Sequence, residues 1–122
     1  NGKANARVKD LARIYGRAII FGSAIVQYSS HVLEDARVSE NALVSNTARV
    51  SGNAIVKGFS WLRGSAEVYD CATLSGSCII EHKSKIGGHA VIEGGKVIGF
   101  SNIKGNLMLS KNIIISSTEN YL

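Results

Sequence analysis

A period of six residues is the feature that most constrains the fold of this chain of 122 residues. From Val8 in steps of six up to Ile98, every position is Val, Ile or Leu. Two residues before each of them stands a small residue, with Lys96 as the exception. Side chains two residues apart lie on the same face of a strand, so each repeat directs one small and one aliphatic side chain inward. An α-helix is excluded, because the apolar stripe on one face of a helix follows a repeat of 3.6 residues, which does not match a period of six.

The chain must turn after each of these short strands. The second position after the aliphatic residue is most often Gly, as in Gly16, Gly52 and Gly88, and is Asp or Asn at others, such as Asn46. These residue types tolerate the positive φ that a tight corner requires. Three such sides close a triangle of about 18 residues per coil, and the coils stack at the strand spacing of about 4.8 Å. The sequence therefore predicts an all-β triangular solenoid of about six coils.

This pattern resembles the hexapeptide-repeat proteins, whose aliphatic and small positions are matched here by pairs such as Val50 and Ala54. The resemblance implies a single-stranded, left-handed parallel β-helix, and the hand comes from the family because the period does not fix it. The best-known members are acyltransferases, usually trimers, so the resemblance also implies a transferase with its site between subunits. Gly stands one place later than in the usual family motif, except at Gly87 and Gly99. That spacing is typical of Ala-x-Val-rich repeat proteins that are often labelled as transferases.

The chain is predicted to be one domain with two parts. Residues 1–98 keep the regular period, and residues 99–122 form a slipped final coil, a cap and the C-terminal tail. The slip is placed after Ile98, because Ile103 follows five residues later, and Leu109 and Ile115 then resume the step of six. Larger residues at the small positions of this last coil indicate a cap for the open end of the solenoid. The start at Asn1, without an initiating Met, fits either a fragment of a longer protein or a processed product, so the sequence does not indicate how the protein is targeted.

Residues 18 apart are expected to stack in columns on the outer faces. One column is apolar and is predicted to be a subunit interface, since contiguous apolar surface usually marks an association site. It consists of Ile25, Leu43, Trp61, Ile79 and Val97. We therefore expect a homo-oligomer, and the resemblance favours a trimer. The alternative is that the C-terminal tail or another part of the chain covers this column.

A second face carries basic residues beside tyrosines and is a candidate site for an anionic ligand, such as a sugar phosphate or a polysaccharide. Its members are Arg13, His31, Arg49, Lys85 and Tyr69. The alternative interpretation is a solvated face that uses Tyr for its strand preference.

One predicted corner stacks the candidates for catalysis, Asn53, Cys71 and His89, above Asp35. A thiol beside an imidazole is the minimum for nucleophilic catalysis, provided that the base activates the thiol. The alternative is that corners simply favour small and polar residues. No repeat before Ile98 gains a residue, so no insertion loop is predicted, which argues against a conventional acyltransferase site. The histidines lack the spacing of a zinc site, and no metal or other cofactor is expected, apart from acyl-CoA as the donor of an acyltransferase.

The composition of the chain limits the classes of partner that we expect. The formal net charge is +5, but no run of Lys and Arg exceeds two residues, so a nucleic-acid partner is not expected. No stretch approaches the ~18 apolar residues that cross a bilayer, so no membrane partner is expected either. Two cysteines are too few for a disulfide scaffold and favour a reducing, cytoplasmic compartment.

Two function classes remain open from the sequence. The first is a hexapeptide-repeat transferase with its site between subunits. The second is a non-catalytic module, a rigid β-helix for assembly or for recognition of a protein or a glycan within a larger protein. The uninterrupted repeats favour the second class, and the frequency of transferases in the family favours the first.

Overall fold

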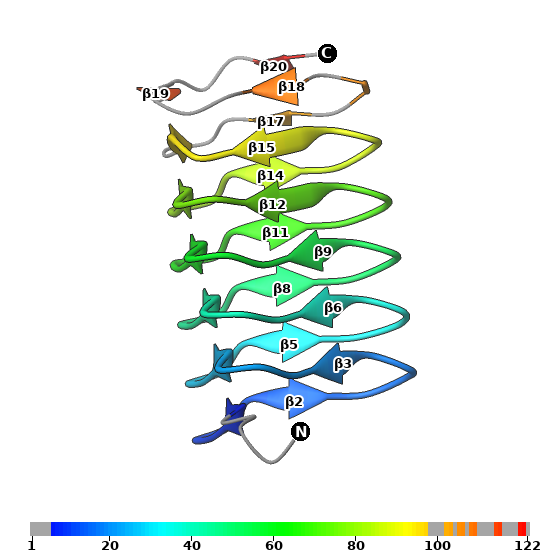
Figure 1. The fold of residues 1–122 in the computed structure, drawn as a ribbon, viewed down its shortest axis with the longest axis vertical. Coiled ribbons are helices and arrows are strands. Elements are labelled where there is room, and N and C mark those ends of the chain that lie inside the picture. Colours follow the sequence, from blue (N-terminus) through cyan, green and yellow to red (C-terminus); the bar gives the residue numbers. More distant parts are fainter. Residues whose placement is uncertain are drawn as a thin grey trace.

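The structure, a computed structural model, describes residues 6–97, 102–103, 105–106, 108–109, 114–115 and 120–121. In these residues the chain winds in coils from one end of the molecule to the other, and no helix is present (Figure 1). Each coil contributes one short strand to each of three parallel sheets, which we call sheets A, B and C.

Sheet A has seven strands: β1 (Arg7–Val8), β4 (Ile25–Val26), β7 (Leu43–Val44), β10 (Trp61–Leu62), β13 (Ile79–Ile80), β16 (Lys96–Val97) and β19 (Ile114–Ile115). Sheet B has seven strands: β2 (Arg13–Ile14), β5 (His31–Val32), β8 (Arg49–Val50), β11 (Glu67–Val68), β14 (Lys85–Ile86), β17 (Asn102–Ile103) and β20 (Asn120–Tyr121). Sheet C has six strands: β3 (Ile19–Ile20), β6 (Arg37–Val38), β9 (Ile55–Val56), β12 (Thr73–Ser75), β15 (Val91–Glu93) and β18 (Met108–Leu109). The all-β parallel solenoid predicted from the six-residue period is confirmed.

Hydrogen bonds between coils follow from the period. The N–H of Arg49 donates to the carbonyl of Ala66 at 2.9 Å, one coil further along, and the N–H of Ser51 donates to Val68 at 2.9 Å. The same step is repeated along the described coils, so residues 18 apart lie side by side on neighbouring strands. Strands of two or three residues are stable here because neighbouring coils satisfy their backbone groups.

Every corner from Asp10 to Gly88 contains a residue of positive φ, and these residues recur at intervals of six. This confirms the predicted corner position, although bulkier residues also take the same conformation, namely Tyr28, Glu34, Glu40 and His82. The two glutamates accept hydrogen bonds from the corner one coil further on. Oε1 of Glu34 accepts from the N–H of Gly52 at 2.6 Å, and Oε1 of Glu40 accepts from the N–H of Gly58 at 2.8 Å. These charge-assisted bonds offset the backbone strain of a side chain in the left-handed region.

The core consists of the two inward columns that the sequence predicts. Its fully buried members include Ala54 of the small column and Leu62 of the aliphatic column. Cys78 is buried at a small position, as expected for a structural cysteine. Ser60 is also buried, and its hydroxyl donates to the carbonyl of Lys57 at 2.7 Å, so a polar residue is tolerated inside.

The register changes earlier than predicted. Val97 is the inward residue after Ile92, one position before the one that the period predicts: it pairs with Ile80 and is only 1 % exposed. The step from Ile92 is five residues, and the shorter corner contains Gly94 and Gly95, both with positive φ. A step of six would have placed the Lys96 side chain inward, and burying an unpaired ammonium group is costly. Lys96 is instead exposed beside Ile79, and Ile98 lies outside the described residues.

The N-terminal end of the described solenoid is open. The inward residue of β1, Val8, is 48 % exposed, whereas Val26 and Val44 in the next two coils are fully buried. The described residues contain no helix long and apolar enough to cross a membrane.

Candidate functional site

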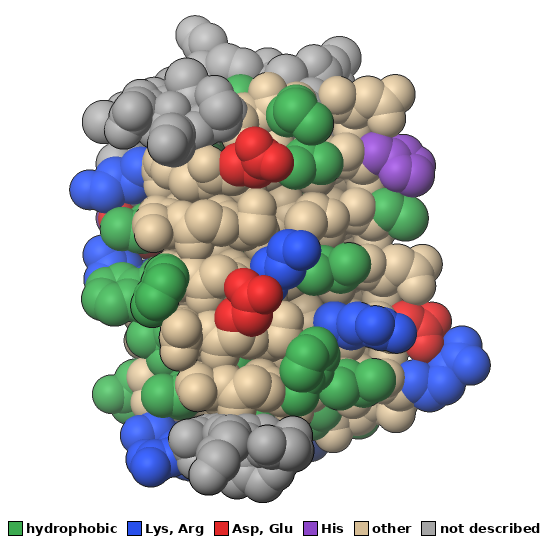
Figure 2. All heavy atoms as spheres, in the orientation of Figure 1, with side chains coloured by type: hydrophobic (Ala, Val, Ile, Leu, Met, Phe, Trp, Pro, Cys, Tyr) green, Lys and Arg blue, Asp and Glu red, His purple; other side chains and the backbone are tan. Residues whose placement is uncertain are grey.

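An apolar ladder stands on the outer face of sheet A, and it consists of Ile25, Leu43, Trp61 and Ile79. These residues are in direct register on neighbouring strands. Trp61 is 41 % exposed, and the other three are partly buried. In Figure 2, hydrophobic side chains gather along the edge of the molecule on the side of sheet A. Val97, predicted as the fifth member, is not part of this ladder, because the five-residue step turns it into the core.

A charged group that the sequence did not single out borders the ladder. The guanidinium of Arg63 lies 5.5 Å from the centroid of the Trp61 ring. Its Nη2 also lies 2.9 Å from Oε1 of Glu81 in an ion pair that is partly buried. A guanidinium over an indole face is attracted by the ring quadrupole. Arg63 therefore contacts both the Trp61 ring and Glu81, and the spacing of two between Trp61 and Arg63 is the sequence signal for the first contact.

The predicted basic face is sheet B. Its outward side chains Arg13, His31 and Arg49 are in register on β2, β5 and β8. Lys85 is further along the same column, separated from Arg49 by Glu67. The negative charge of Glu67 therefore interrupts the basic column. Only Arg13, His31 and Arg49 follow one another without an acidic residue between them.

His31 lies between Arg13 and Arg49 on the neighbouring strands, and one of its ring nitrogens lacks a partner. Its Nδ1 is buried and has no hydrogen-bond partner. The ring of Tyr15 meets the imidazole edge to face, with 6.0 Å between ring centroids. Buried polar atoms without a partner are rare in folded proteins, so this nitrogen marks His31 as a candidate for a role beyond packing.

Tyr69 lies across Gly87 of the next coil. A methyl group placed on Gly87 would come within 2.2 Å of the Tyr69 ring, so the ring occupies the space that a side chain at residue 87 would fill. Burial raises the pKa of the Tyr69 phenol, and the negative charges of Asp70 and Glu67 raise it further. These observations favour a structural role for Tyr69 over the ligand-binding role that was predicted as one alternative.

The predicted catalytic column lies at the corner between sheets B and C. The N–H of Cys71 donates to the carbonyl of Gly88, which places Cys71 and His89 on neighbouring coils. Both side chains are exposed. In the part of the chain that the structure describes, no hydrogen bond joins the thiol to the imidazole. The arrangement is a stack of polar corner residues, and the pairing of Cys71 with His89 in catalysis stays a prediction.

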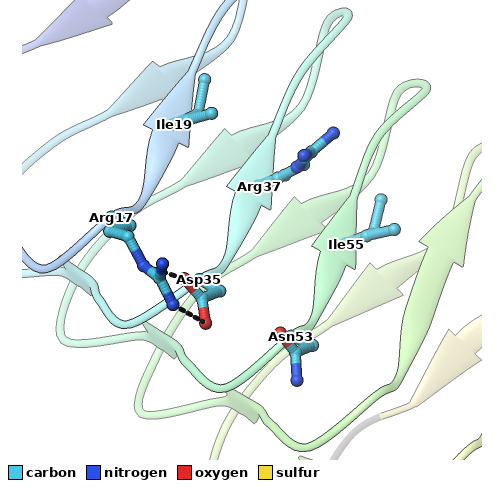
Figure 3. Close-up of a pocket in the computed structure, with 6 residues that line it drawn as sticks. All are labelled: Arg17, Ile19, Asp35, Arg37, Asn53 and Ile55. Atoms are coloured by element: carbon cyan, nitrogen blue, oxygen red, sulfur yellow. Dashed lines mark hydrogen bonds and ion pairs between the residues drawn. The ribbon is translucent and has the colours of Figure 1, made fainter.

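A surface furrow with a volume of about 460 Å³ lies beside the N-terminal part of the corner column, at Asp35 and Asn53. It is lined by Arg17, Ile19, Asp35, Arg37, Asn53 and Ile55. One wall is formed by corner side chains and the other by outward side chains of β3, β6 and β9 (Figure 3). The sequence had indicated Asp35 and Asn53 as neighbours but not the two arginines.

A floor of backbone separates the two walls of the furrow. Between Asp35 and Arg37, and again between Asn53 and Ile55, the chain contains an alanine whose side chain points into the core. Ala36 and Ala54 are fully buried, so nothing projects from the outer surface at these positions. The furrow is therefore a direct consequence of the small inward column.

The furrow contains one ion pair. Nε of Arg17 lies 2.9 Å from Oδ1 of Asp35, and Nη2 donates to Oδ2 at 3.3 Å. Arg37 projects between Ile19 and Ile55, and its guanidinium has no hydrogen-bond or ion-pair partner among the described residues (Figure 3). The described residues contain no group of three or more His, Cys, Asp or Glu side chains placed to hold a metal ion.

In the comparison with known proteins, residues 12–28 match the family model described as YdcK Beta solenoid repeat. This segment contains three of the small and aliphatic pairs, those of β2, β3 and β4. The chain has no significant match to a curated protein or to a solved structure. The repeat match and the three parallel sheets together fit a hexapeptide-repeat β-helix family, as the sequence predicted.

Proposed function

We propose that this protein is a rigid β-solenoid module that assembles with further copies of itself through the apolar ladder on sheet A. The observation that carries the proposal is the ladder itself: four large apolar side chains in register on an outer face. The resemblance to trimeric hexapeptide-repeat proteins favours three copies around a common axis.

The chemistry of the ladder suits a second copy of the same chain. In-register strands present their side chains at a common step of about 4.8 Å, so an identical solenoid laid alongside matches the ladder rung by rung. The ladder is bordered along the sheet by Arg7 and Lys96, which are both exposed. An apolar centre with a charged rim is the usual composition of a subunit interface.

The test is the absolute mass in solution, measured by light scattering. We expect a multiple of the 13.0 kDa chain mass, three for a trimer. Trp61→Arg is expected to lower the mass to that of one chain and to leave the β-sheet circular dichroism unchanged. Tyr15→Arg is the matched control, because Tyr15, directly after β2 of sheet B, is 44 % exposed and Trp61 is 41 % exposed. A single-chain mass for the wild type, or an equal effect of both variants, would overturn the proposal.

A transferase is the second candidate, and the group around His31 supports it. An imidazole between Arg13 and Arg49 is a candidate general base beside a site for an anion. The two guanidinium groups suit the phosphates of an acyl-CoA donor, which Arg binds through paired hydrogen bonds. We expect acetyl-CoA to bind to the wild-type protein, and we expect Arg13→Gln and Arg49→Gln to weaken that binding.

His31→Asn separates binding from chemistry in this second candidate. It is expected to abolish acyl transfer to an acceptor amine or hydroxyl while acetyl-CoA still binds. No binding of acetyl-CoA to the wild type would eliminate the candidate, and unchanged transfer by His31→Asn would eliminate the role of His31.

A further inference from the structure

We propose that the furrow on sheet C binds an acidic sugar chain, a linear oligosaccharide that contains uronate units. This site is distinct from the apolar ladder and from the group around His31, since it lies on the third sheet and at the corner that leads into it. It stands whether or not the chain associates.

The recognition of a carboxylate rests on Arg37. Its guanidinium is exposed and has no hydrogen-bond or ion-pair partner among the described residues, whereas the guanidinium of Arg17 is already paired with Asp35. A planar guanidinium matches the two oxygens of a carboxylate. The pairing with Arg17 also neutralises Asp35, so this carboxylate does not repel an incoming anion.

The sugar ring has a place beside that carboxylate. Ile19 and Ile55 lie on the strands to either side of Arg37, about 4.8 Å away in each direction. Ile19 is 45 % exposed, so its side chain presents apolar surface to the furrow. The C–H faces of sugar rings are apolar, and they pack on aliphatic side chains while the ring substituents point sideways.

The opposite wall supplies partners for hydroxyl groups. Asn53 has an amide that both donates and accepts, and its side chain is exposed on the furrow. Asp35 keeps acceptor capacity beyond its two bonds to Arg17, and Arg17 keeps further N–H donors. Planar polar groups of this kind bind neighbouring hydroxyls of one sugar in pairs.

The shape of the furrow favours a linear oligosaccharide over a small metabolite as the ligand. A site for a small molecule usually buries roughly 70–90 % or more of the ligand's surface. This furrow is partly open to solvent, and its lining residues come from three coils, from Arg17 to Asn53. A ligand that extends along the solenoid axis meets a new polar group at each coil, and a linear oligosaccharide extends in steps of similar length.

The experiment is an NMR titration of the isotope-labelled protein with tetragalacturonate, and with the neutral tetrasaccharide maltotetraose as comparison. We expect saturable shifts of the backbone amides of residues 35–37 and 53–55 with the acidic sugar only. Arg37→Gln is expected to weaken binding by about tenfold or more, which is the usual effect of losing a charge-assisted contact.

Lys9→Gln is the matched control. It also removes one positive charge from an exposed position, but beside sheet A directly after β1, outside the furrow. We expect less than about a twofold change for it, because an exposed charge that far away is screened by salt. The proposal is overturned by equal weakening in both variants, by equal binding of the neutral sugar, or by no saturation up to about 10 mM.

Discussion

The open N-terminal end gives the clearest test of how this solenoid is stabilised, through the same substitution at two positions of one column. Val8 and Val44 are both inward residues of sheet A, in β1 and β7. Val44 is fully buried and Val8 is 48 % exposed. Changing each to Ala removes two methyl groups from chemically identical sites, so only the burial differs.

The expected losses follow from that burial. At Val44 the two methyl groups contribute about 1.6 kcal/mol of transfer free energy, and the cavity left behind adds roughly 1 kcal/mol. The free energy of unfolding therefore falls by about 2.5 kcal/mol. At Val8 about half of the transfer free energy is lost and no closed cavity forms, which gives a loss of about 0.8 kcal/mol.

Urea unfolding followed by circular dichroism measures both variants. For an m-value of about 2 kcal/mol per molar urea, the midpoint of Val44→Ala should fall by about 1.2 M and that of Val8→Ala by about 0.4 M. Hydrogen exchange should show the loss of amide protection in the coil of Val44 and its neighbours, because each coil contacts only those next to it. Equal losses in the two variants would refute the open end, and a loss below about 1 kcal/mol at Val44 would refute the closed core.

Three further predictions concern single side chains. Val50→Asp should abolish folding, because it places an unpaired carboxylate in a fully buried position; a retained β-sheet spectrum at neutral pH would contradict the inward assignment. Because burial, Asp70 and Glu67 raise the pKa of Tyr69 above 10.0, the folded chain holds this proton longer than the unfolded chain. Its contribution to stability is then complete below pH 10 and is lost as the pH rises through the folded pKa, so Tyr69→Phe should unfold at higher pH than wild type in an alkaline titration. In the native protein a thiol reagent should modify the exposed Cys71 and spare the buried Cys78, and mass spectrometry of the peptides distinguishes the two.

The fold could be predicted because the period carries it redundantly. Each pair of a small and an aliphatic residue predicts the same short strand and the same corner. The inward columns, the corners and the three sheets can therefore be predicted even where one residue departs from the pattern. The outward residues carry no such redundancy. The apolar ladder was found because its members are 18 apart, and the same step found the basic residues of sheet B.

The furrow was missed because its walls belong to two different columns. Asp35 and Asn53 were recognised as one corner stack, but Arg37 lies two residues further along, across an inward alanine. The bare backbone over Ala36 and Ala54 forms the floor, and a count in steps of 18 does not detect it. Outward pairs at positions i and i+2, compared over successive coils, are the sequence signal that could have found this site.

The register change near the C-terminal end was present in the sequence as a single exception. Lys96 was the one residue that broke the small column, and a step of five after Ile92 brings Gly95 to the small position and Val97 to the aliphatic one. The step of six to Ile103 then follows directly from Val97. Ile98 obscured this solution, since it also satisfied the aliphatic column.

That single step also changes the proposed interface. With Val97 outward the apolar ladder would continue at β16, but the shift places Lys96 beside Ile79, and Arg7 stands beside Ile25 at the other end. Four apolar rungs are thereby bounded by a cation at each end. A second copy displaced by one rung along the axis would bury one of these cations against an isoleucine, at a cost in desolvation that the in-register arrangement avoids. In the proposed assembly, the two cations would therefore set the axial alignment as well as the edges of the interface. Lys96→Val should lengthen the ladder, and in light scattering it should produce larger or more heterogeneous species than the wild type.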